Sequence, residues 1–307
     1  MYPDGSTSLP GTVLGGLRNQ LINSDFRVWQ RGTVVTSGQY GADRWAGGTG
    51  NGITEWRQRV NGNVPECPIA AEVTSPGGTS DYIVQSVELP FAGNAGCFSS
   101  GSTWTLSFWA NVNMISNWTQ TNCLQFRDGN DGVNNIVNAV SGGNSAPEIV
   151  QTSTTDSSWN KYAIKGLVID SAPSSTNTTL DVRIKLPTSA VRIGQCQLEP
   201  GPVATPFEQI PVGLSLQLCQ RYYEVCYAGA RAEPSGGYLG DYVSFKVEKR
   251  IKPTLTEVDG SGNGNLADSF QSFNATNTWG VGVQWTTSGK SAPYYSYSFQ
   301  FFADAEL

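Results

Sequence analysis

The stretch Thr179–Pro187, TLDVRIKLP, alternates apolar and charged residues more cleanly than any other part of the chain. Its apolar residues are Leu180, Val182, Ile184 and Leu186, and its charged residues are Asp181, Arg183 and Lys185. Because side chains of a β-strand point alternately to its two faces, this period of two predicts a strand with one face in a core. Similar runs at residues 102–112, 159–169 and 191–199 predict an antiparallel sandwich of jelly-roll type.

The composition of the chain also indicates an all-β protein. Its 307 residues include 35 glycines, and only 14% of them are charged, whereas 11% are aromatic. A helical protein would need more Ala, Leu, Glu and Lys, while aromatic residues favour pleated surfaces. The length allows two domains, each with its own core.

Four segments are expected along the chain. Residues 1–18 are rich in turn-forming residues and are predicted to be an N-terminal attachment arm. Residues 19–208 are predicted to form the jelly-roll sandwich. Residues 209–230 are predicted to be a linker that carries a short helix, and residues 231–307 a smaller distal β domain.

The linker is expected to hold one amphipathic helix. Leu214, Leu218, Tyr222 and Cys226 recur at intervals of four, which predicts a three-turn helix with these residues in one apolar stripe. A helix this short is marginal by itself, so its stripe has to be covered. Either its own sandwich covers the stripe, or two copies of the chain cover it in a trimer.

Several classes of partner and chemistry are not expected. The net charge of -6 contains no basic block, which disfavours nucleic acid as a partner. No signal-peptide pattern and no run of 18 apolar residues occurs, so no membrane insertion is predicted. Histidine is absent, which excludes Ser-His-Asp catalysis and His-containing metal sites. With no nucleotide-binding loop motif either, we predict no cofactor and no catalytic residue.

Neither cysteines nor carboxylates predict a metal site. The six cysteines are Cys67, Cys97, Cys123, Cys196, Cys219 and Cys226. They include no CxxC pair, and without an export signal they are expected to be mostly free thiols. The sequence Asp259–Gly264 resembles the start of a calcium loop, but Phe270 replaces the bidentate Glu at its twelfth position. A β-turn is therefore the preferred interpretation of that stretch.

Three aromatic residues lie off the core pattern. A carbohydrate site usually presents a flat aromatic ring at a rim, with amides and carboxylates nearby to hold hydroxyl groups. Most aromatic residues here occupy the inward positions of alternating strands. The exceptions Tyr294, Tyr238 and Trp109 are the predicted ligand-binding residues.

Three stretches of the chain, residues 21–45, 104–169 and 195–224, resemble tail-fibre and receptor-binding proteins of tailed bacteriophages and prophages. In that family a jelly-roll domain similar to carbohydrate-binding modules ends in a Q-L-E-x-G-x-x-A-T-x-F-E signature. The matching residues of this chain are Gln197, Leu198, Glu199, Gly201, Ala204, Thr205, Phe207 and Glu208.

Two further motifs carry the resemblance. The family's short helix holds C-Q-R-Y-Y, and the matching residues here are Cys219, Gln220, Arg221, Tyr222 and Tyr223. The later stretch KRIKPTLT resembles the family's M-R-x-x-P-T strand, with Lys249 in place of Met. The matched signature and helix residues are expected to have structural roles.

The resemblance implies a non-enzymatic virion protein, made in the host cytoplasm, that forms a homotrimer and recognises a host-surface glycan during adsorption. Its N-terminal arm would bind another virion protein of the tail or baseplate. The arm is short and leaves no room for a long trimeric shaft, which argues against a main fibre and favours a terminal tip docked on another tail protein or a fibre on the capsid. The alternatives are a purely structural adaptor or decoration protein and, more remotely, a polysaccharide depolymerase. A depolymerase would need only two carboxylates, but the long β-helix repeats of such phage enzymes are missing.

Overall fold

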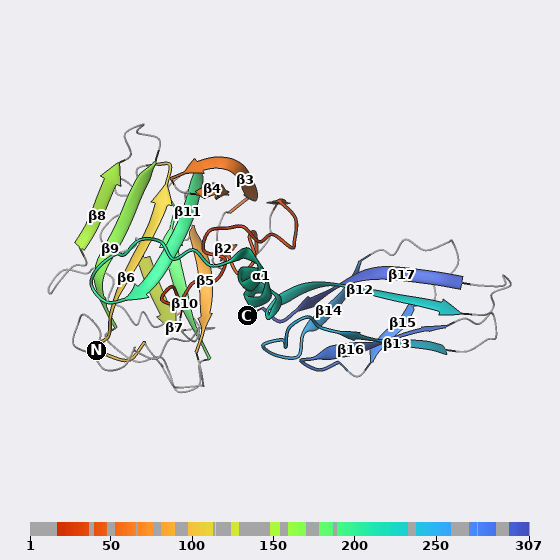
Figure 1. Cartoon of the computed structure of the whole chain (residues 1–307). Helices are drawn as coiled ribbons and strands as arrows, with labels where there is room; N and C mark the ends of the chain where they lie inside the picture. The colour runs from red at the N-terminus through yellow and green to blue at the C-terminus, as the bar shows by residue number, and fades with distance from the viewer. Residues whose placement is uncertain are drawn as a thin grey trace. The chain divides into compact units, whose positions relative to one another are not determined.

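The computed structural model divides the chain into two compact units, Met1–Pro211 and Val212–Leu307. The residues that the structure describes are 17–36, 40–47, 53–65, 67–75, 81–89, 98–112, 114, 124–128, 148–153, 159–169, 178–186, 189–232, 238–258, 270–274, 276–286 and 295–306. Figure 1 shows that these residues form strands almost throughout, with one short helix. Within them, no helix has the length and hydropathy needed to cross a membrane.

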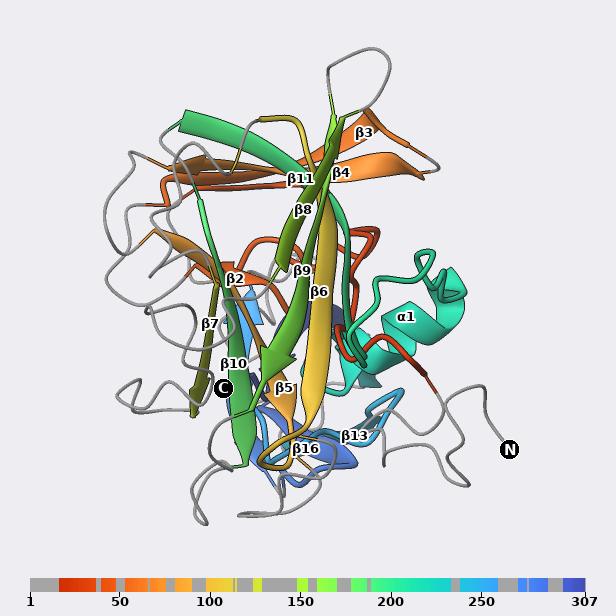
Figure 2. The same cartoon turned by 90° about the vertical axis from the view of Figure 1, so that its left-hand side faces the viewer.

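The first unit is a sandwich of two antiparallel sheets (Figure 2). The seven-stranded sheet has the order β1 (Val34–Thr36), β3 (Glu55–Val64), β4 (Cys67–Ser75), β11 (Ser189–Pro200), β6 (Thr103–Ala110), β9 (Asn160–Val168) and β8 (Glu148–Ser153). The four-stranded sheet has the order β2 (Ala46–Gly47), β5 (Tyr82–Glu88), β10 (Thr179–Lys185) and β7 (Leu124–Asp128). The predicted all-β class and jelly-roll sandwich are therefore confirmed.

The core of the first unit lies between its two sheets. On β10, Leu180, Val182 and Ile184 are fully buried, as the period of two predicts. They belong to one continuous apolar cluster that also contains Trp104 of β6. Arg183 differs from the prediction, because only 9% of it is exposed. The reason is that β10 is paired on both edges, with β5 and β7, and an ion pair to Asp181 at 2.9 Å compensates the charge.

The second unit is a smaller pair of antiparallel sheets preceded by the helix α1 (Val212–Gln220). One sheet has the order β12 (Tyr223–Ala232), β17 (Tyr295–Asp304) and β14 (Thr254–Val258), and the other has the order β13 (Tyr238–Ser244), β16 (Gly280–Thr286) and β15 (Phe270–Asn274). Phe301 and Ala303 of β17 pack in one cluster with Val281 and Val283 of β16. Side chains from both sheets thus form a separate core.

The predicted apolar stripe of the helix is wrong. The helix ends at Gln220, so Tyr222 and Cys226 lie beyond it. Its buried residues are Ser215, Cys219 and Gln220, whereas Leu214 is 39% exposed. The interval of four continued past the end of the helix into β12, where strand pairing and not a helical face decides which side chains are buried.

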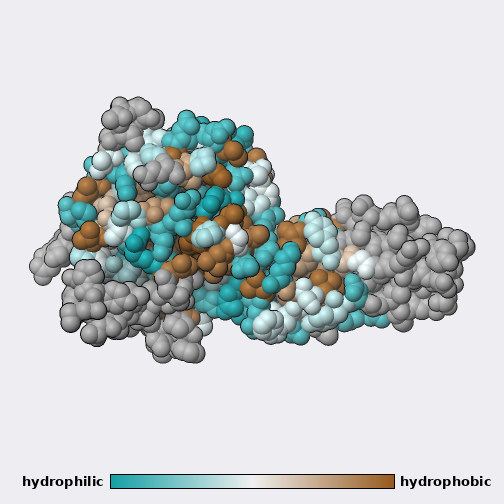
Figure 3. Space-filling view, viewed as in Figure 1, coloured by the Kyte–Doolittle hydropathy of each residue, from teal (hydrophilic) through white to brown (hydrophobic). Residues whose placement is uncertain are grey.

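On the face drawn in Figure 3, hydrophobic surface occurs as separate patches among hydrophilic residues.

The boundary between the units falls inside the expected linker of residues 209–230. The second unit begins at Val212 and includes the helix. Strand β12 begins at Tyr223 and pairs with β17 over its full length. The connecting segment is therefore shorter than the predicted linker, and the helix and its following strand belong to the second unit.

Candidate functional site

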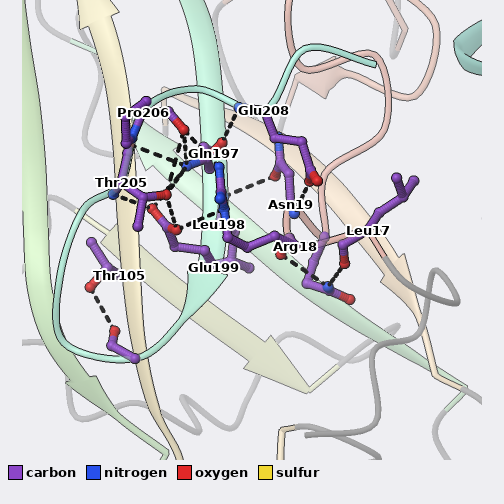
Figure 4. A network of polar contacts seen from close by, with 12 residues as sticks. Leu17, Arg18, Asn19, Thr105, Gln197, Leu198, Glu199, Thr205, Pro206 and Glu208 are labelled. Atoms are coloured by element: carbon purple, nitrogen blue, oxygen red, sulfur yellow. Dashed lines mark hydrogen bonds and ion pairs between the residues drawn. The ribbon is translucent and has the colours of Figure 1, made fainter. Parts of the chain in front are cut away.

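Six polar side chains join the two ends of the first unit and are named here the exit clasp (Figure 4). They are Arg18, Asn19, Gln197, Glu199, Thr205 and Glu208. Four of them belong to the Q-L-E-x-G-x-x-A-T-x-F-E signature. Gln197 and Glu199 lie on β11, where period two places them on one face, and both are almost fully buried.

Glu199 is the centre of the exit clasp. Its carboxylate accepts hydrogen bonds from the Gln197 side-chain amide at 2.9 Å and from the backbone N–H of Thr205 at 2.9 Å. The Thr205 hydroxyl donates to the second carboxylate oxygen at 2.6 Å. Arg18 Nε lies 3.2 Å from the same oxygen. Two N–H groups, one hydroxyl and one guanidinium therefore compensate the negative charge of a carboxylate that is only 1% exposed.

Asn19 and Glu208 close the exit clasp across 189 positions of sequence. The backbone N–H of Asn19 donates to Glu208 Oε2 at 2.7 Å, and the backbone N–H of Glu208 donates to Gln197 Oε1 at 2.7 Å. Asn19 Oδ1 accepts from the backbone N–H of Leu198 at 3.0 Å. The segment that enters the sandwich and the segment that leaves it are therefore fixed to each other.

The remaining signature residues shape the turn between β11 and the outgoing segment. Gly201 has a φ of 102°, a left-handed conformation that favours glycine. The Thr105 hydroxyl donates to its carbonyl oxygen at 2.7 Å. Phe207 is half-buried. The turn at Gly201 reverses the chain, so that Thr205 returns to Glu199.

A cavity of about 60 Å³ opens beside the outgoing segment. It is lined by Asp25, Cys67, Gln195, Phe207 and Gln209. Burial raises the pKa of Asp25, and the nearby Arg27 guanidinium partly opposes that effect. Gln195 lies at a bulge of β11 with a φ of 50°. The cavity has room for several water molecules, and no sequence pattern indicated it.

The C-Q-R-Y-Y residues have structural positions at the junction of α1 and β12. Cys219, Tyr222 and Tyr223 are buried, and the Tyr223 ring packs against that of Phe302 at a centroid distance of 5.6 Å. Arg221 is half-buried, and its Nη1 donates to the carbonyl oxygen of Glu248 at 3.4 Å. Four of the five residues are buried in the second unit, and the structural role expected for them stays a prediction.

Lys249, which replaces the family's Met, lies in the same junction. Its ammonium is fully buried and forms an ion pair with Glu224 and a hydrogen bond to the carbonyl oxygen of Gln220. The Phe245 ring lies 4.8 Å from the ammonium. Burial lowers the pKa of Lys249, and Glu224 opposes that shift. Lys249 is thus a buried charge with a partner that compensates it.

Two of the three predicted glycan-binding residues belong to the part of the chain that the structure describes. Trp109 lies in the first unit, half-buried against the cluster that contains Cys67 and Trp159, with the Lys161 ammonium 6.0 Å from its ring. Tyr238 is the first residue of β13 in the second unit, opposite Thr286. Tyr294 lies outside the described residues.

Sequence reasoning missed three aromatic residues that are more than half exposed among those that the structure describes. Tyr227 is 68% exposed, Trp279 is 60% exposed and Tyr242 is 52% exposed, all in the second unit. Tyr227 and Tyr242 follow the alternating pattern of their strands, so a search for aromatic residues off that pattern did not select them. Their orientation toward solvent depends on which strand face the core occupies, and the sequence alone did not settle that question.

The described residues contain no cluster of three metal-ligating side chains. The predicted turn Asp259–Gly264 falls outside them. Cys67, Cys196, Cys219 and Cys226 are buried free thiols. Burial raises the pKa of Cys196 well above the usual value, and burial together with Glu224 raises that of Cys226 to about 12. Cys97 and Cys123 also fall outside the described residues.

No protein-family model and no curated protein matches the chain. Several solved structures are similar to it, and three of them are described here. A "putative sugar binding protein" from Bacteroides thetaiotaomicron is 12% identical with a TM-score of 0.33, over 59% of this chain and 99% of that one. The enzymatically active domain of tailspike protein 4 from bacteriophage CBA120 is 13% identical with a TM-score of 0.31, over 60% of this chain and 21% of that one. Discoidin II from Dictyostelium discoideum is 14% identical with a TM-score of 0.21, over 88% and 93%.

Proposed function

We propose that the chain is an attachment protein of a tailed-bacteriophage virion that recognises a host-surface glycan. The observation that supports this proposal is the exit clasp. Four signature residues, Gln197, Glu199, Thr205 and Glu208, contact one another in a single network. A chance match of single letters would not require those side chains to meet, so their contacts favour a shared local structure with the family that the sequence resembles.

The geometry suits a rigid carrier of recognition sites. The exit clasp fixes the path of the chain from the sandwich toward the second unit, and both units are built from paired strands. Binding proteins commonly present their contact residues on such rigid scaffolds. In the proposed assembly the chain is a homotrimer, and residues 1–18 bind another virion protein. Three copies would raise affinity for a repetitive polymer by avidity.

Binding of the purified chain to an array of bacterial O-polysaccharides and capsular polysaccharides tests the function. We expect saturable binding to at least one polymer and no release of reducing ends from it. A chain that binds no polymer would favour the alternative of a structural virion component. Release of reducing ends would instead indicate a depolymerase.

Light scattering coupled to size-exclusion chromatography tests the trimer separately. The proposal requires a mass of about three times the 32.9 kDa of one chain. A monomer at micromolar concentration would contradict this part of the proposal and leave glycan binding to be judged by the array.

A further inference from the structure

The β13–β16–β15 sheet has one face in the core and one face outside it. Val281 and Val283 of β16 are buried in the core of the second unit. Alternation therefore places the intervening Gly280, Gly282 and Gln284 on the opposite face. This surface is named here the outer face, and it consists of Tyr242, Gly280, Gly282, Gln284, Ser272 and Asn274.

The register between strands brings the remaining residues of the outer face together. Gly282 is paired with Tyr242 of β13 on one side and with Asn274 of β15 on the other. Ser272 is paired with Gln284. Directly paired residues share a face of the sheet, so one aromatic ring, two amides and a hydroxyl lie around a pair of glycines.

The missing side chains of the glycines make room for the Tyr242 ring. A Cβ atom at Gly280 would lie only 2.6 Å from Tyr242 Oη and 2.7 Å from its Cζ. The ring therefore lies directly over the backbone at Gly280, while 52% of the residue stays exposed. Its position is fixed from below, and its accessible side has the flat apolar shape on which a sugar ring stacks.

The polar groups of the outer face are already oriented. Ser272 Oγ donates to Asn274 Oδ1 at 3.1 Å, and Asn274 Nδ2 donates to Gln284 Oε1 at 2.7 Å. With its oxygen engaged, the Gln284 amide directs its nitrogen donors elsewhere, and no hydrogen bond to another described residue uses them. Gln284 lies two residues along the sheet from the Tyr242–Gly282 pair, about 7 Å, so one short saccharide can contact both.

We propose that the outer face binds a neutral host-surface polysaccharide, with Tyr242 stacking on a sugar ring and Gln284 donating to a hydroxyl. None of its six residues carries a charge, so the outer face has no cation that could bind a polyanion. A ring beside amides and hydroxyls is the combination that holds uncharged sugars. This assignment rests on the proposed function and names its site.

Binding of purified neutral O-polysaccharides and anionic capsular polysaccharides to the full chain tests the assignment. Tyr242→Ala is compared with Tyr227→Ala, because Tyr227 is also exposed, at 68% against 52% for Tyr242, but lies on β12 of the other sheet. Gln284→Ala is compared with Gln217→Ala, which removes an exposed amide from α1. We expect Tyr242→Ala to bind a neutral polymer about tenfold more weakly, as for a stacked aromatic anchor, and Gln284→Ala about threefold more weakly, as for one hydrogen bond. Both controls should bind like the wild type.

The outcomes separate the site from the function. If the wild type binds a neutral polymer and the outer-face variants bind it equally well, the site is elsewhere and the proposed function stands. If the wild type binds only anionic polymers, the assignment to the outer face is overturned. A wild type that binds nothing contradicts the proposed function itself. Thermal unfolding of each variant shows whether a loss of binding comes from a loss of folding, and Gln284→Ala keeps the test valid if Tyr242→Ala unfolds.

Discussion

The exit clasp and the outer face are built from the same kinds of residue but use them differently. In the exit clasp Gln197 is fully buried. The hydrogen-bond donors to the Glu199 carboxylate come from neighbouring residues of the chain itself. On the outer face Asn274 is exposed, and the N–H groups of the Gln284 amide donate no hydrogen bond to another described residue. Buried polar groups stabilise a fold only when they are satisfied internally, whereas exposed ones can exchange water for a ligand. Burial therefore distinguishes the structural role from the binding role here.

The largest effect is expected from Glu199→Ala. The change leaves the Thr205 N–H and hydroxyl without their acceptor and removes one of the acceptors of the buried Gln197 amide, which costs about 3–5 kcal/mol. The sandwich should melt about 10 °C lower in differential scanning calorimetry. Glu148→Gln is the control, because that carboxylate is 67% exposed and lies 3.5 Å from Lys165, so the expected change is under about 1 kcal/mol. Equal melting temperatures for both variants would mean that the exit clasp does not stabilise the sandwich.

A second large effect is expected from Lys249→Met in the second unit, which replaces the buried ammonium by an uncharged side chain. Glu224, 2% exposed, would lose its buried partner, at a cost of about 3 kcal/mol. Hydrogen exchange of β12, followed by mass spectrometry, should become faster. The double variant Lys249→Met with Glu224→Gln should recover part of the protection, because it removes the uncompensated charge. Faster exchange in the double variant than in the single one would contradict this account.

A smaller, local effect is expected at the cysteines. Cys196 lies on β11 beneath the exit clasp and is fully buried, so iodoacetamide at pH 8 should leave it unmodified in the native chain. In Glu199→Ala its modification should accelerate, while Cys226 in the other unit should stay protected. Peptide mass spectrometry measures both sites. After denaturation without reductant all six thiols should react, and a missing thiol would indicate a disulfide.

The smallest effect is expected from Tyr242→Phe. The ring remains over Gly280 and only the hydroxyl is lost, so stability should change by less than about 0.5 kcal/mol. Because the ring is the proposed contact, polysaccharide binding should weaken by less than about threefold, the value of one ordinary hydrogen bond. Surface plasmon resonance on the polymer that the wild type binds would detect the difference. A loss as great as that of Tyr242→Ala would mean that the hydroxyl, and not the ring, dominates recognition.

The sequence predicted those features that depend on a single strand. The alternation in TLDVRIKLP identified the buried residues of β10 because one face of that strand meets the core. The helix stripe failed because an interval of four cannot reveal where a helix ends, and α1 ends at Gln220. The outer face was beyond reach for a different reason. Its geometry depends on the pairing of Tyr242 with Gly282, and the register between separate strands cannot be derived from the periodicity of either one.

The bond between Asn19 and Glu208 has a mechanical consequence. A hydrogen bond of 2.7 Å joins the two ends of the sandwich. The 188 residues between these ends therefore form a closed loop, which lies outside the shortest connection from residue 17 to residue 209. A pull along that line loads the few hydrogen bonds of the junction before it loads any sheet. The sheets of the sandwich therefore bear little of the applied force as long as the hydrogen bonds of the junction stay intact.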